Sequence, residues 1–299
     1  MKISSNLRRH ANCFSANPDQ GKRLDYRSAG YLDATERNLL NAGMPQYYSH
    51  IVALFDKEKT YSFVIDFARL SLQFTKAGNQ DPQVNELRTE MHSRLFNAAI
   101  QTSRYELAHS VLALFTDPAL QYSSLRSLVI KMCESSHASQ LTELPFIGLQ
   151  DTVDEILANK CQSIVEVNVG VPYHKILYAW RIKHSDFRGA ATVCLERLQR
   201  LQQSGEGDRA LGDDTLETAV TRQYVALINV LSCVDPKQAW ILAEEPPRKQ
   251  ASGVKMAGQK RKIVTLEDIR KSYQEELDRI VAIQNDQFAF AEGDEMDIL

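Results

Sequence analysis

The sequence predicts an all-α protein, an irregular α-solenoid of stacked antiparallel helix pairs. Three observations lead to this fold class. Gly and Pro are scarce, at 13 and 9 of 299 residues, which favours long helices over a turn-rich sandwich or barrel. Apolar residues recur at the helical spacing of three and four along most of the chain. Short polar turns separate these periodic segments, and the helix–turn–helix unit recurs roughly six times, as in helical-repeat proteins.

Composition and charge exclude several classes of protein. Hydrophobic residues make up 43% and charged residues 24% of the chain, which is ordinary for a folded domain. The formal net charge of −3 argues against nucleic acid as a main partner. No apolar run approaches the ~18 residues of a membrane-spanning helix. The five cysteines stand singly, without a C-x-x-C motif, which predicts neither a disulfide framework nor a zinc site and indicates a reducing compartment.

A leader is predicted to precede one helical-repeat domain. Residues 1–43 are polar and broken by proline and glycine, so we expect them to be partly disordered, with a short helix over 34–40. Residues 44–245 carry the helical period and form the predicted domain. Its helices are expected from Met44 onward and over 60–75, 83–102, 105–115, 118–133, 151–161, 172–184, 187–203 and 216–234, with a final helical stub at 236–243.

Capping residues set several of the predicted helix boundaries. Asp81 and Asp117 each precede a proline, which suits an N-cap followed by the first helical turn. Ser103 is expected to cap the helix over 105–115. The helix over 60–75 is apolar on all sides, which predicts that it is buried among other helices.

Three segments interrupt the helical pattern. Residues 144–149 are predicted to be a packed connection, and the glycine-rich residues 204–214 a loop insertion. Residues 163–171 alternate Val with polar residues as a strand does, but the sequence offers no second strand to pair with them. We therefore expect an extended loop there.

A weak internal repeat supports the solenoid. The motifs Asp25–Ala29, Arg104–Ala108 and Asp186–Ala190 each place an aromatic residue three positions before an alanine. The aromatic residues lie 79 and 82 positions apart, near twice the ~40-residue period of paired-helix repeats. A bulky residue followed by a small one suits a close crossing of two helices.

Three segments of biased composition end the chain. Residues 246–264 are a predicted basic linker, residues 265–284 a predicted amphipathic helix with Thr265 as its cap, and residues 285–299 an acidic tail. The apolar stripe of the helix is the candidate protein-interaction surface, and we expect part of it to be exposed. Folding back onto the solenoid and docking into another protein both need this stripe, so both stay open. It consists of Leu266, Ile269, Tyr273, Leu277 and Ile280.

The basic residues of the linker are candidates for a nuclear-import signal or for contact with an acidic partner. A plain solvated linker explains them equally well. Nucleic-acid binding through this segment would be a secondary, salt-sensitive activity. The candidate residues are Arg248, Lys249, Lys260, Arg261 and Lys262.

No motif supports catalysis, so we expect no enzyme, cofactor, bound metal or small-molecule substrate. Phosphate-binding glycine loops, G-x-S-x-G and H-E-x-x-H motifs do not occur in the sequence. Two Glu-x-x-His pairs, Glu106/His109 and Glu134/His137, are similar to part of a di-iron site. Ser110 to Cys133 contains no Glu, however, so the four carboxylates of such a site are not available.

The isolated histidines and cysteines are expected to be structural. His174 and His184 lie on or beside an apolar helix and are expected to be packed or surface side chains. Four cysteines fall on apolar helical stretches, where buried and inert thiols are the default. These are Cys133, Cys161, Cys194 and Cys233.

Motifs in several helices follow one another in a specific order. The most specific are Tyr173 to Trp180 and Asp186 to Ala191. The others are Tyr47-Tyr48 with Ile51 and Leu54-Phe55, Val64 to Ala68, Leu95-Phe96, Tyr105 with Ala108, Leu128-Val129 with Cys133-Glu134, and Leu144 to Leu149. Together, over residues 44–201, they resemble the C-terminal helical region of the nucleoporin 120/160 family, a scaffold subunit of the Y-shaped complex of the nuclear pore.

This resemblance implies a structural role in the nucleus, at the nuclear envelope, in nucleocytoplasmic transport of protein and mRNA. It implies that the helical arm meets the short-arm and stem nucleoporins at the hub of the complex. Family members carry an N-terminal β-propeller that this sequence lacks, so we expect a fragment or a reduced homologue, with residues 1–43 outside the resemblance. A helical adaptor subunit of another coat or regulatory complex is the alternative.

Overall fold

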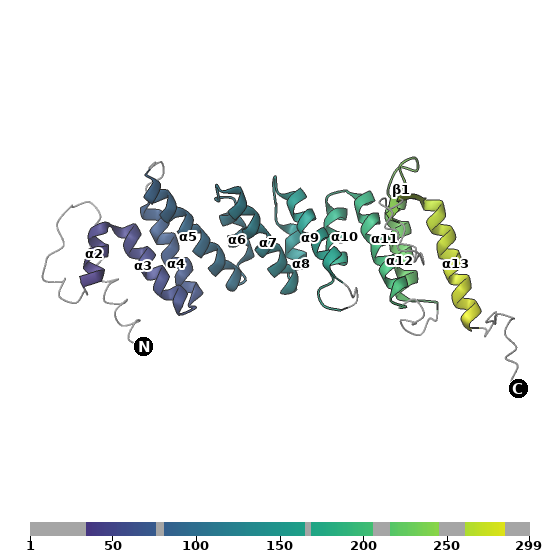
Figure 1. Ribbon diagram of the computed structural model, residues 1–299, viewed down its shortest axis with the longest axis horizontal. Helices are drawn as coiled ribbons and strands as arrows, with labels where there is room; N and C mark the ends of the chain where they lie inside the picture. Colours follow the sequence, from purple (N-terminus) through teal and green to yellow (C-terminus); the bar gives the residue numbers. More distant parts are fainter. Residues whose placement is uncertain (1–33, 76–80, 165–168, 206–215, 245–260, 285–299) are drawn as a thin grey trace, which may run out of the picture. The chain divides into compact units, whose positions relative to one another are not determined.

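The computed structural model describes residues 34–75, 81–164, 169–205, 216–244 and 261–284 (Figure 1). Within these ranges the chain forms twelve α-helices and one two-stranded sheet, so the predicted all-α fold class of helical repeats is confirmed. The chain divides into two compact units, Met1–Leu114 and Phe115–Leu299. None of the described helices has the length and apolarity needed to span a bilayer.

Several predicted segments fall outside the described residues. They are the leader up to residue 33, most of the loop over 204–214, the linker from 246 to 260 and the acidic tail. The short helix expected in the leader is present as α2 (Ala34–Ala42). At the predicted extended loop over 163–171, α9 (Gln150–Ser163) ends at Ser163, and residues 169–171 form no strand.

In the first unit each helix packs on the next one along the chain. Three aromatic rings join α3 (Met44–Lys57) to α4 (Tyr61–Phe74): Phe67 stacks on Tyr48 and Phe55 with ring centroids 6.1 and 5.4 Å apart. The expectation that α4 is buried on all sides is wrong, since Phe63 and Phe74 are about half exposed. Each of these rings covers one aromatic ring of α3 and leaves its outer side in solvent. The unit continues with α5 (Pro82–Gln101) and α6 (Tyr105–Leu112).

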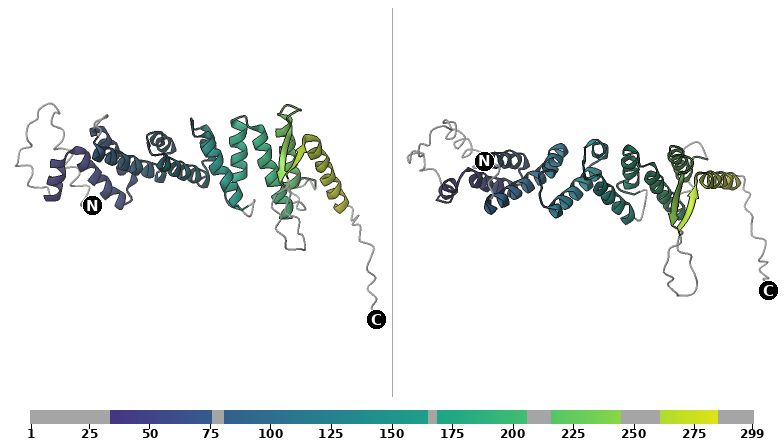
Figure 2. Two further views of the ribbon diagram at one scale, coloured as in Figure 1. Left: turned by 45° about the horizontal axis from the view of Figure 1, so that its top comes forward. Right: turned by 90° about the horizontal axis from the view of Figure 1, so that it is seen from above.

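In the second unit, the helices from α9 onward pack on their neighbours in sequence, and Figure 2 shows them side by side. Arg181 of α10 ties three helices together. Its guanidinium donates to both carboxylate oxygens of Asp154 on α9, at 2.7 and 2.6 Å, and to the carbonyl oxygen of Gly189 on α11, at 2.9 Å. The elements are α7 (Pro118–Glu134), α8 (Ala138–Glu143), α9, α10 (Tyr173–Lys183), α11 (Phe187–Gln203), α12 (Ala219–Ser232), β1 (Trp240–Glu244), β2 (Arg261–Thr265) and α13 (Leu266–Gln284).

The same turn ends four of the helices. Lys59, Ser103, Ser136 and Ser185 all have positive φ angles, between 56° and 62°. The residue after each of them donates its backbone N–H to the carbonyl five positions earlier, at 2.8–3.0 Å, as in a Schellman turn. Ser103 therefore ends α5, and Arg104 precedes α6 without a side-chain cap. The predicted capping role of Ser103 is wrong for this reason.

This turn gives the weak internal repeat a physical basis. Tyr105 and Phe187 each stand two positions after a turn residue and open the next helix. Ala108 and Ala190, three positions further on, are fully buried, as a close helix crossing requires. The third copy of the motif, at residues 25–29, lies outside the described residues.

Other boundary predictions have mixed outcomes. Asp81 and Asp117 accept hydrogen bonds from backbone N–H groups of α5 and α7, so both predicted caps are confirmed. The predicted connection over 144–149 is packed at Phe146, which is 1% exposed and whose ring centroid lies 5.9 Å from that of Trp180. The short helix α8 before it was not predicted from the sequence.

The largest departure from prediction is a hairpin near the C-terminal helix. The expected helical stub at 236–243 and the end of the linker instead form β1 and β2, which pair antiparallel with Ile241 opposite Val264 and Leu242 opposite Ile263. Both runs are rich in apolar and β-branched residues, which favour strands. Their pairing spans the long segment between them, so a local sequence pattern does not reveal it.

We expect Ser185→Gly to stabilise the protein by up to about 1 kcal/mol, because a left-handed conformation strains any residue with a Cβ atom. Urea denaturation followed by circular dichroism measures the change in the free energy of unfolding. The matched control is Ser123→Gly at an exposed position inside α7, where glycine should cost about 0.5–1 kcal/mol. Equal effects at both positions would contradict the assigned turn.

Candidate protein-interaction site

The predicted interaction stripe lies on α13 and packs toward α12. Ile269 and Ile280 are 2% and 6% exposed, and Leu266, Tyr273 and Leu277 are half-buried. The expected exposure is therefore wrong for Ile269 and Ile280. The last helix folds back onto the stack because this buries its apolar stripe against α12. Contact of the stripe with another protein stays a prediction.

One hydrophobic cluster joins α11, α12, the hairpin and α13. Ile241 from β1 and Ile269 from α13 enter the same buried group as the apolar residues of α11 and α12. The rings of Tyr224 on α12 and Tyr273 on α13 lie 5.8 Å apart between centroids. The C-terminal helix is therefore part of the core of this unit.

Polar contacts fix the hairpin and the start of α13. The guanidinium of Arg188 on α11 lies 4.0 Å from the ring centroid of Trp240 on β1, a cation–π contact. The hydroxyl of Thr265 donates to the carboxylate of Asp268 at 2.7 Å, and the Asp268 N–H donates back to that hydroxyl at 3.3 Å. This reciprocal cap confirms Thr265 as the helix start. The hydrogen bonds from Thr265 lower the pKa of Asp268.

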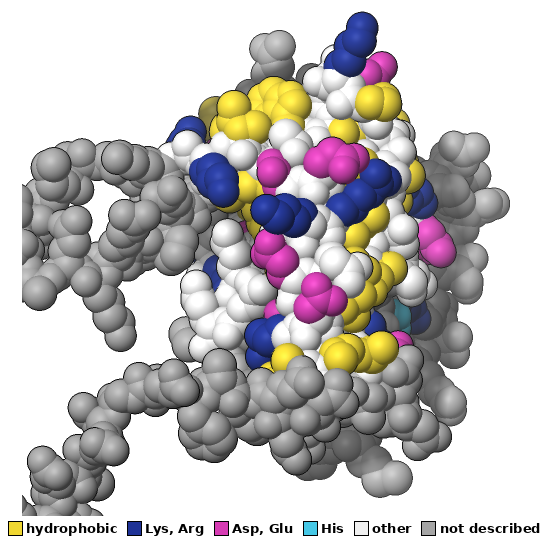
Figure 3. Space-filling view, turned by 90° about the vertical axis from the view of Figure 1, so that its right-hand side faces the viewer, with side chains coloured by type: hydrophobic (Ala, Val, Ile, Leu, Met, Phe, Trp, Pro, Cys, Tyr) yellow, Lys and Arg dark blue, Asp and Glu magenta, His cyan; other side chains and the backbone are white. Residues whose placement is uncertain are grey.

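The outer surface at this end of the chain keeps apolar side chains exposed. Leu242 and Ile263 form an exposed cross-strand pair on the hairpin, at 43% and 58%, and Val281 and Ile283 are 42% and 37% exposed near the end of α13. Figure 3 shows hydrophobic side chains gathered in a band beside charged ones on this end. Several of the charged side chains of α13 pair within the helix, as in Arg270–Glu267 and Arg279–Glu276.

The basic candidate residues are described only in part. Arg261 and Lys262 lie on β2 and are exposed. Arg248, Lys249 and Lys260 lie outside the described residues. The import and acidic-partner interpretations of this segment therefore stay predictions.

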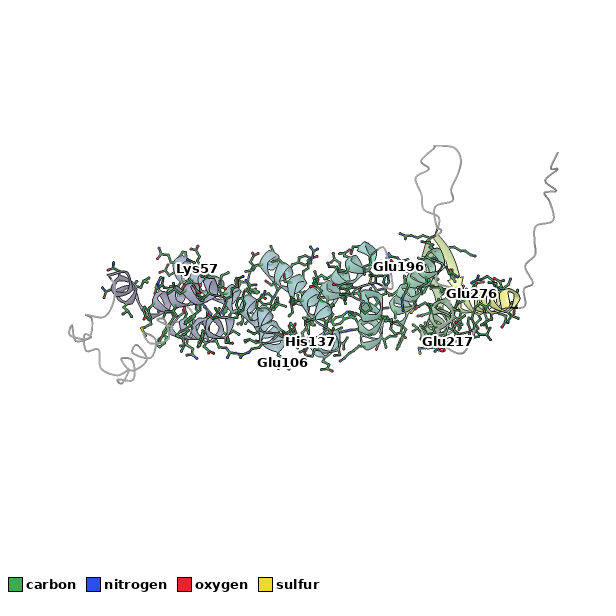
Figure 4. The ribbon with its side chains drawn as sticks, turned by 90° about the horizontal axis from the view of Figure 1, so that it is seen from below. Lys57, Glu106, His137, Glu196, Glu217 and Glu276 are labelled. Carbon is green, nitrogen blue, oxygen red and sulfur yellow. The ribbon has the colours of Figure 1, made fainter. Side chains whose placement is uncertain are left out.

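The Glu-x-x-His pair at the end of α7 does not share one helical face. Glu134 is the last residue of α7, and His137 lies beyond the turn, with its Nδ1 2.7 Å from the carbonyl oxygen of Ser135. Figure 4 labels His137 and Glu106, the acid of the other pair. Among the described residues no group of three His, Cys, Asp or Glu side chains is arranged to hold a metal ion.

Three of the four helical cysteines are buried, as predicted. Burial raises the pKa of Cys133 and Cys161 to about 12 and that of Cys194 to about 11. These thiols therefore stay protonated and inert at neutral pH. Cys233 is exposed just after α12, so its expected burial is wrong.

Sequence reasoning missed a groove between α10 and α12. Because α11 packs on both of these helices, its side chains form the floor between them. The groove encloses a cavity of about 300 Å³, lined by His174, Lys175 and Tyr178 of α10, Val193, Cys194 and Arg197 of α11, and Gln223 and Ala226 of α12.

Two polar side chains in this groove are unusual. His174 is 3% exposed, and its Nε2 has no hydrogen-bond partner in the part of the chain that the structure describes. Burial, together with the charges of Arg200 and Arg197, lowers the pKa of His174 to about 4. Arg197 is half-buried and donates to the side-chain oxygen of Gln223 at 3.1 Å. Its burial lowers its own pKa.

Comparison with known proteins identifies the family. Residues 3–134 match the family described as Nucleoporin Nup120, HEAT repeats. The chain is 44% identical to nucleoporin NUP120 of Chaetomium thermophilum, over 92% of this chain and 28% of that protein. The chain belongs to the Nup120/Nup160 family of nucleoporins.

Other Nup120/Nup160 proteins are more distant. Nup160 of Mus musculus is 27% identical over 76% of this chain, and nup120 of Schizosaccharomyces pombe 24% identical over 83%. These matches cover 16% and 20% of those proteins, so the chain spans less than a third of the relatives' length. The family match begins at residue 3, so it includes the predicted leader, for which the sequence motifs had shown no resemblance.

We expect Ile269→Ala to lower the free energy of unfolding by about 2–4 kcal/mol, because it opens a cavity in the shared core. Val281→Ala, on the exposed side of the same helix, should cost less than about 0.5 kcal/mol. Thermal and urea denaturation of both variants measure the difference. Similar small losses would show that α13 is not part of the core.

We expect the stability of the protein to fall by about 1–2 kcal/mol from pH 7 to pH 5 through His174 alone. The unfolded histidine binds a proton near pH 6.5, whereas the folded one resists protonation down to about pH 4. The unfolded state therefore gains protons first as the pH falls. Urea denaturation at both pH values should show that His174→Gln loses less stability between pH 7 and pH 5 than the wild-type chain does. An equal loss of stability in the two chains would contradict a buried, neutral His174.

Proposed function

We propose that this chain is a structural, non-enzymatic part of the nuclear pore scaffold at the nuclear envelope, which joins nucleoporins of the Y complex and supports nucleocytoplasmic transport. The similarity to nucleoporin NUP120 over 92% of the chain carries this proposal. As partners we propose the short-arm and stem nucleoporins that meet at the hub of the complex, in line with the family resemblance.

The fold supports a scaffold role. Stacked helix pairs present a long lateral surface for other proteins. Three of the four described cysteines, Cys133, Cys161 and Cys194, are buried thiols of raised pKa, so they do not supply a nucleophile at neutral pH. These features favour binding over catalysis.

The end of the second unit is the proposed contact region. Two apolar side chains of α13, Val281 and Ile283, are exposed, and exposed apolar side chains mark candidate contact surfaces. The predicted stripe is occupied by α12, so we place the contact on the exposed apolar residues that border the stripe near the end of α13. These are Val281 on one side and Ile283 on the other, and together they are called the outer flank of α13. The half-buried Tyr273 and Leu277 are available at the edge of this flank.

Light scattering after gel filtration tests the proposed function. The intact chain is mixed with the helical regions of the short-arm and stem nucleoporins, because truncation before α13 would expose the core at Ile269. A stable co-eluting complex with either partner supports the proposal. A monodisperse chain that binds neither partner contradicts it.

We expect the double variant Val281→Asp, Ile283→Asp to weaken partner binding at least about tenfold while helicity and melting temperature stay unchanged, since burying charge in an apolar contact is costly. The matched control is Val225→Asp, 41% exposed on α12. Titration calorimetry compares the three chains. Equal losses in variant and control, or no loss in either, would contradict the proposed contact on α13.

A further inference from the structure

We propose that the groove between α10 and α12 is a docking site for a carboxylate side chain, Asp or Glu, presented beside an apolar side chain on a helix of a partner protein. This inference rests on the scaffold function proposed above and adds the chemistry of one contact. The proposed site is separate from the outer flank of α13.

The shape of the groove fits one anchoring side chain and its neighbour. Its volume of about 300 Å³ exceeds that of a single large side chain. Tyr178 on one wall, the small Ala226 on the other and Val193 on the floor are apolar surfaces. Helices of partner proteins dock in such grooves through anchors spaced along one face. The apolar walls favour an anchored side chain over a free hydrated anion.

The charge of the groove selects an acidic anchor. Arg197 is half-buried, yet among the described residues no carboxylate pairs with it, and Lys175 is exposed beside it. Three glutamates, on α11, just before α12 and on α13, already have an arginine partner. Figure 4 labels Glu196, Glu217 and Glu276, which pair with Arg200, Arg222 and Arg279 at 2.6–2.7 Å. A partially desolvated guanidinium without an ion pair is complementary to an incoming carboxylate.

His174 supplies an independent indication. Its side chain is almost fully buried and its Nε2 has no hydrogen-bond partner in the described structure. Buried polar atoms are almost always paired, so an orphaned one in a cavity points to an absent ligand. As a neutral imidazole with its proton on Nε2, His174 can donate to a carboxylate oxygen. Arg197 and His174 would then hold one carboxylate from two helices.

Titration calorimetry with the helical region of whichever Y-complex nucleoporin co-elutes with the chain tests this site. Arg197→Met keeps the aliphatic stem and removes the charge, and we expect binding to weaken at least about tenfold. Ala226→Phe fills the groove while keeping its charges, and we expect a similar loss. The matched control is Arg222→Gln, an exposed arginine on α12, which should bind within about twofold of wild type. Melting curves verify that all three variants fold.

A double-mutant cycle identifies the carboxylate. Asp→Asn and Glu→Gln variants of the partner are titrated against wild type and Arg197→Met. One of them should weaken binding to wild type about tenfold and have no effect on binding to Arg197→Met.

The outcomes separate this proposal from the proposed function. Wild-type affinity in both Arg197→Met and Ala226→Phe, or no coupled carboxylate in the partner, overturns the docking site and leaves the scaffold function standing. No complex with the wild-type chain overturns both. If removal of residues 285–299 raises partner affinity tenfold in wild type but not in Arg197→Met, the chain's own acidic tail fills the groove, and the partner-helix proposal is wrong.

Discussion

The helices of the second unit bury their apolar stripes against elements that lie one or two positions away in the order of the chain. The cluster that joins α11, α12, β1 and α13 shows this constraint most clearly, because Ile241 and Ile269 complete a core that the two longer helices begin. Among the described elements, α12 and β2 pack on α13 and cover one side of it, while side chains on its other sides are exposed. The position of α13, the buried stripe and the exposed Val281 all follow from this packing.

Repeated turn geometry makes this packing regular. Four helices end in the same left-handed residue, and the N–H that follows it bonds to the carbonyl five positions earlier. Such a turn reverses the chain within a few residues and brings the next helix against the previous one. In the second unit the guanidinium of Arg181 on α10 connects three successive helices, because it donates hydrogen bonds to Asp154 on α9 and to the Gly189 carbonyl oxygen on α11. The groove above α11 results from this packing, since it lies between α10 and α12, which both pack on α11.

Local signals predicted the parts of this fold that local physics determines. The helical spacing of apolar residues predicted the fold class and most helices, and Asp81 and Asp117 predicted two N-caps. Both signals depend on residues only a few positions apart in the chain. The hairpin was missed because β1 and β2 pair across a long segment. The turn residue Ser103 was taken for a cap because serine is a common N-cap and the sequence does not reveal its positive φ angle. The sequence did not decide whether the apolar stripe of α13 packs on the solenoid or on another protein, because both contacts need the same apolar residues.

The candidate site was predictable only in part. The sequence singled out α13, but the orientation of its stripe depends on the shape of α12. The groove at His174 brings together residues from three helices, and no spacing in the sequence reveals that arrangement. His174 was expected to be a packed or surface side chain and is buried, and its orphaned Nε2 becomes visible only once Arg197 and Gln223 are placed beside it.

Hydrogen–deuterium exchange tests the central claim, that the second unit is a preformed scaffold whose last helix is core on one side and free on the other. Exchange is followed by mass spectrometry in the free chain and with the short-arm or stem nucleoporin added. Slow exchange in both α12 and α13 of the free chain, slowing further in α13 when the partner binds, is the predicted result. Rapid exchange of α13 in the free chain, with protection gained only on binding, would contradict it, because α13 would then fold on its partner and not on α12.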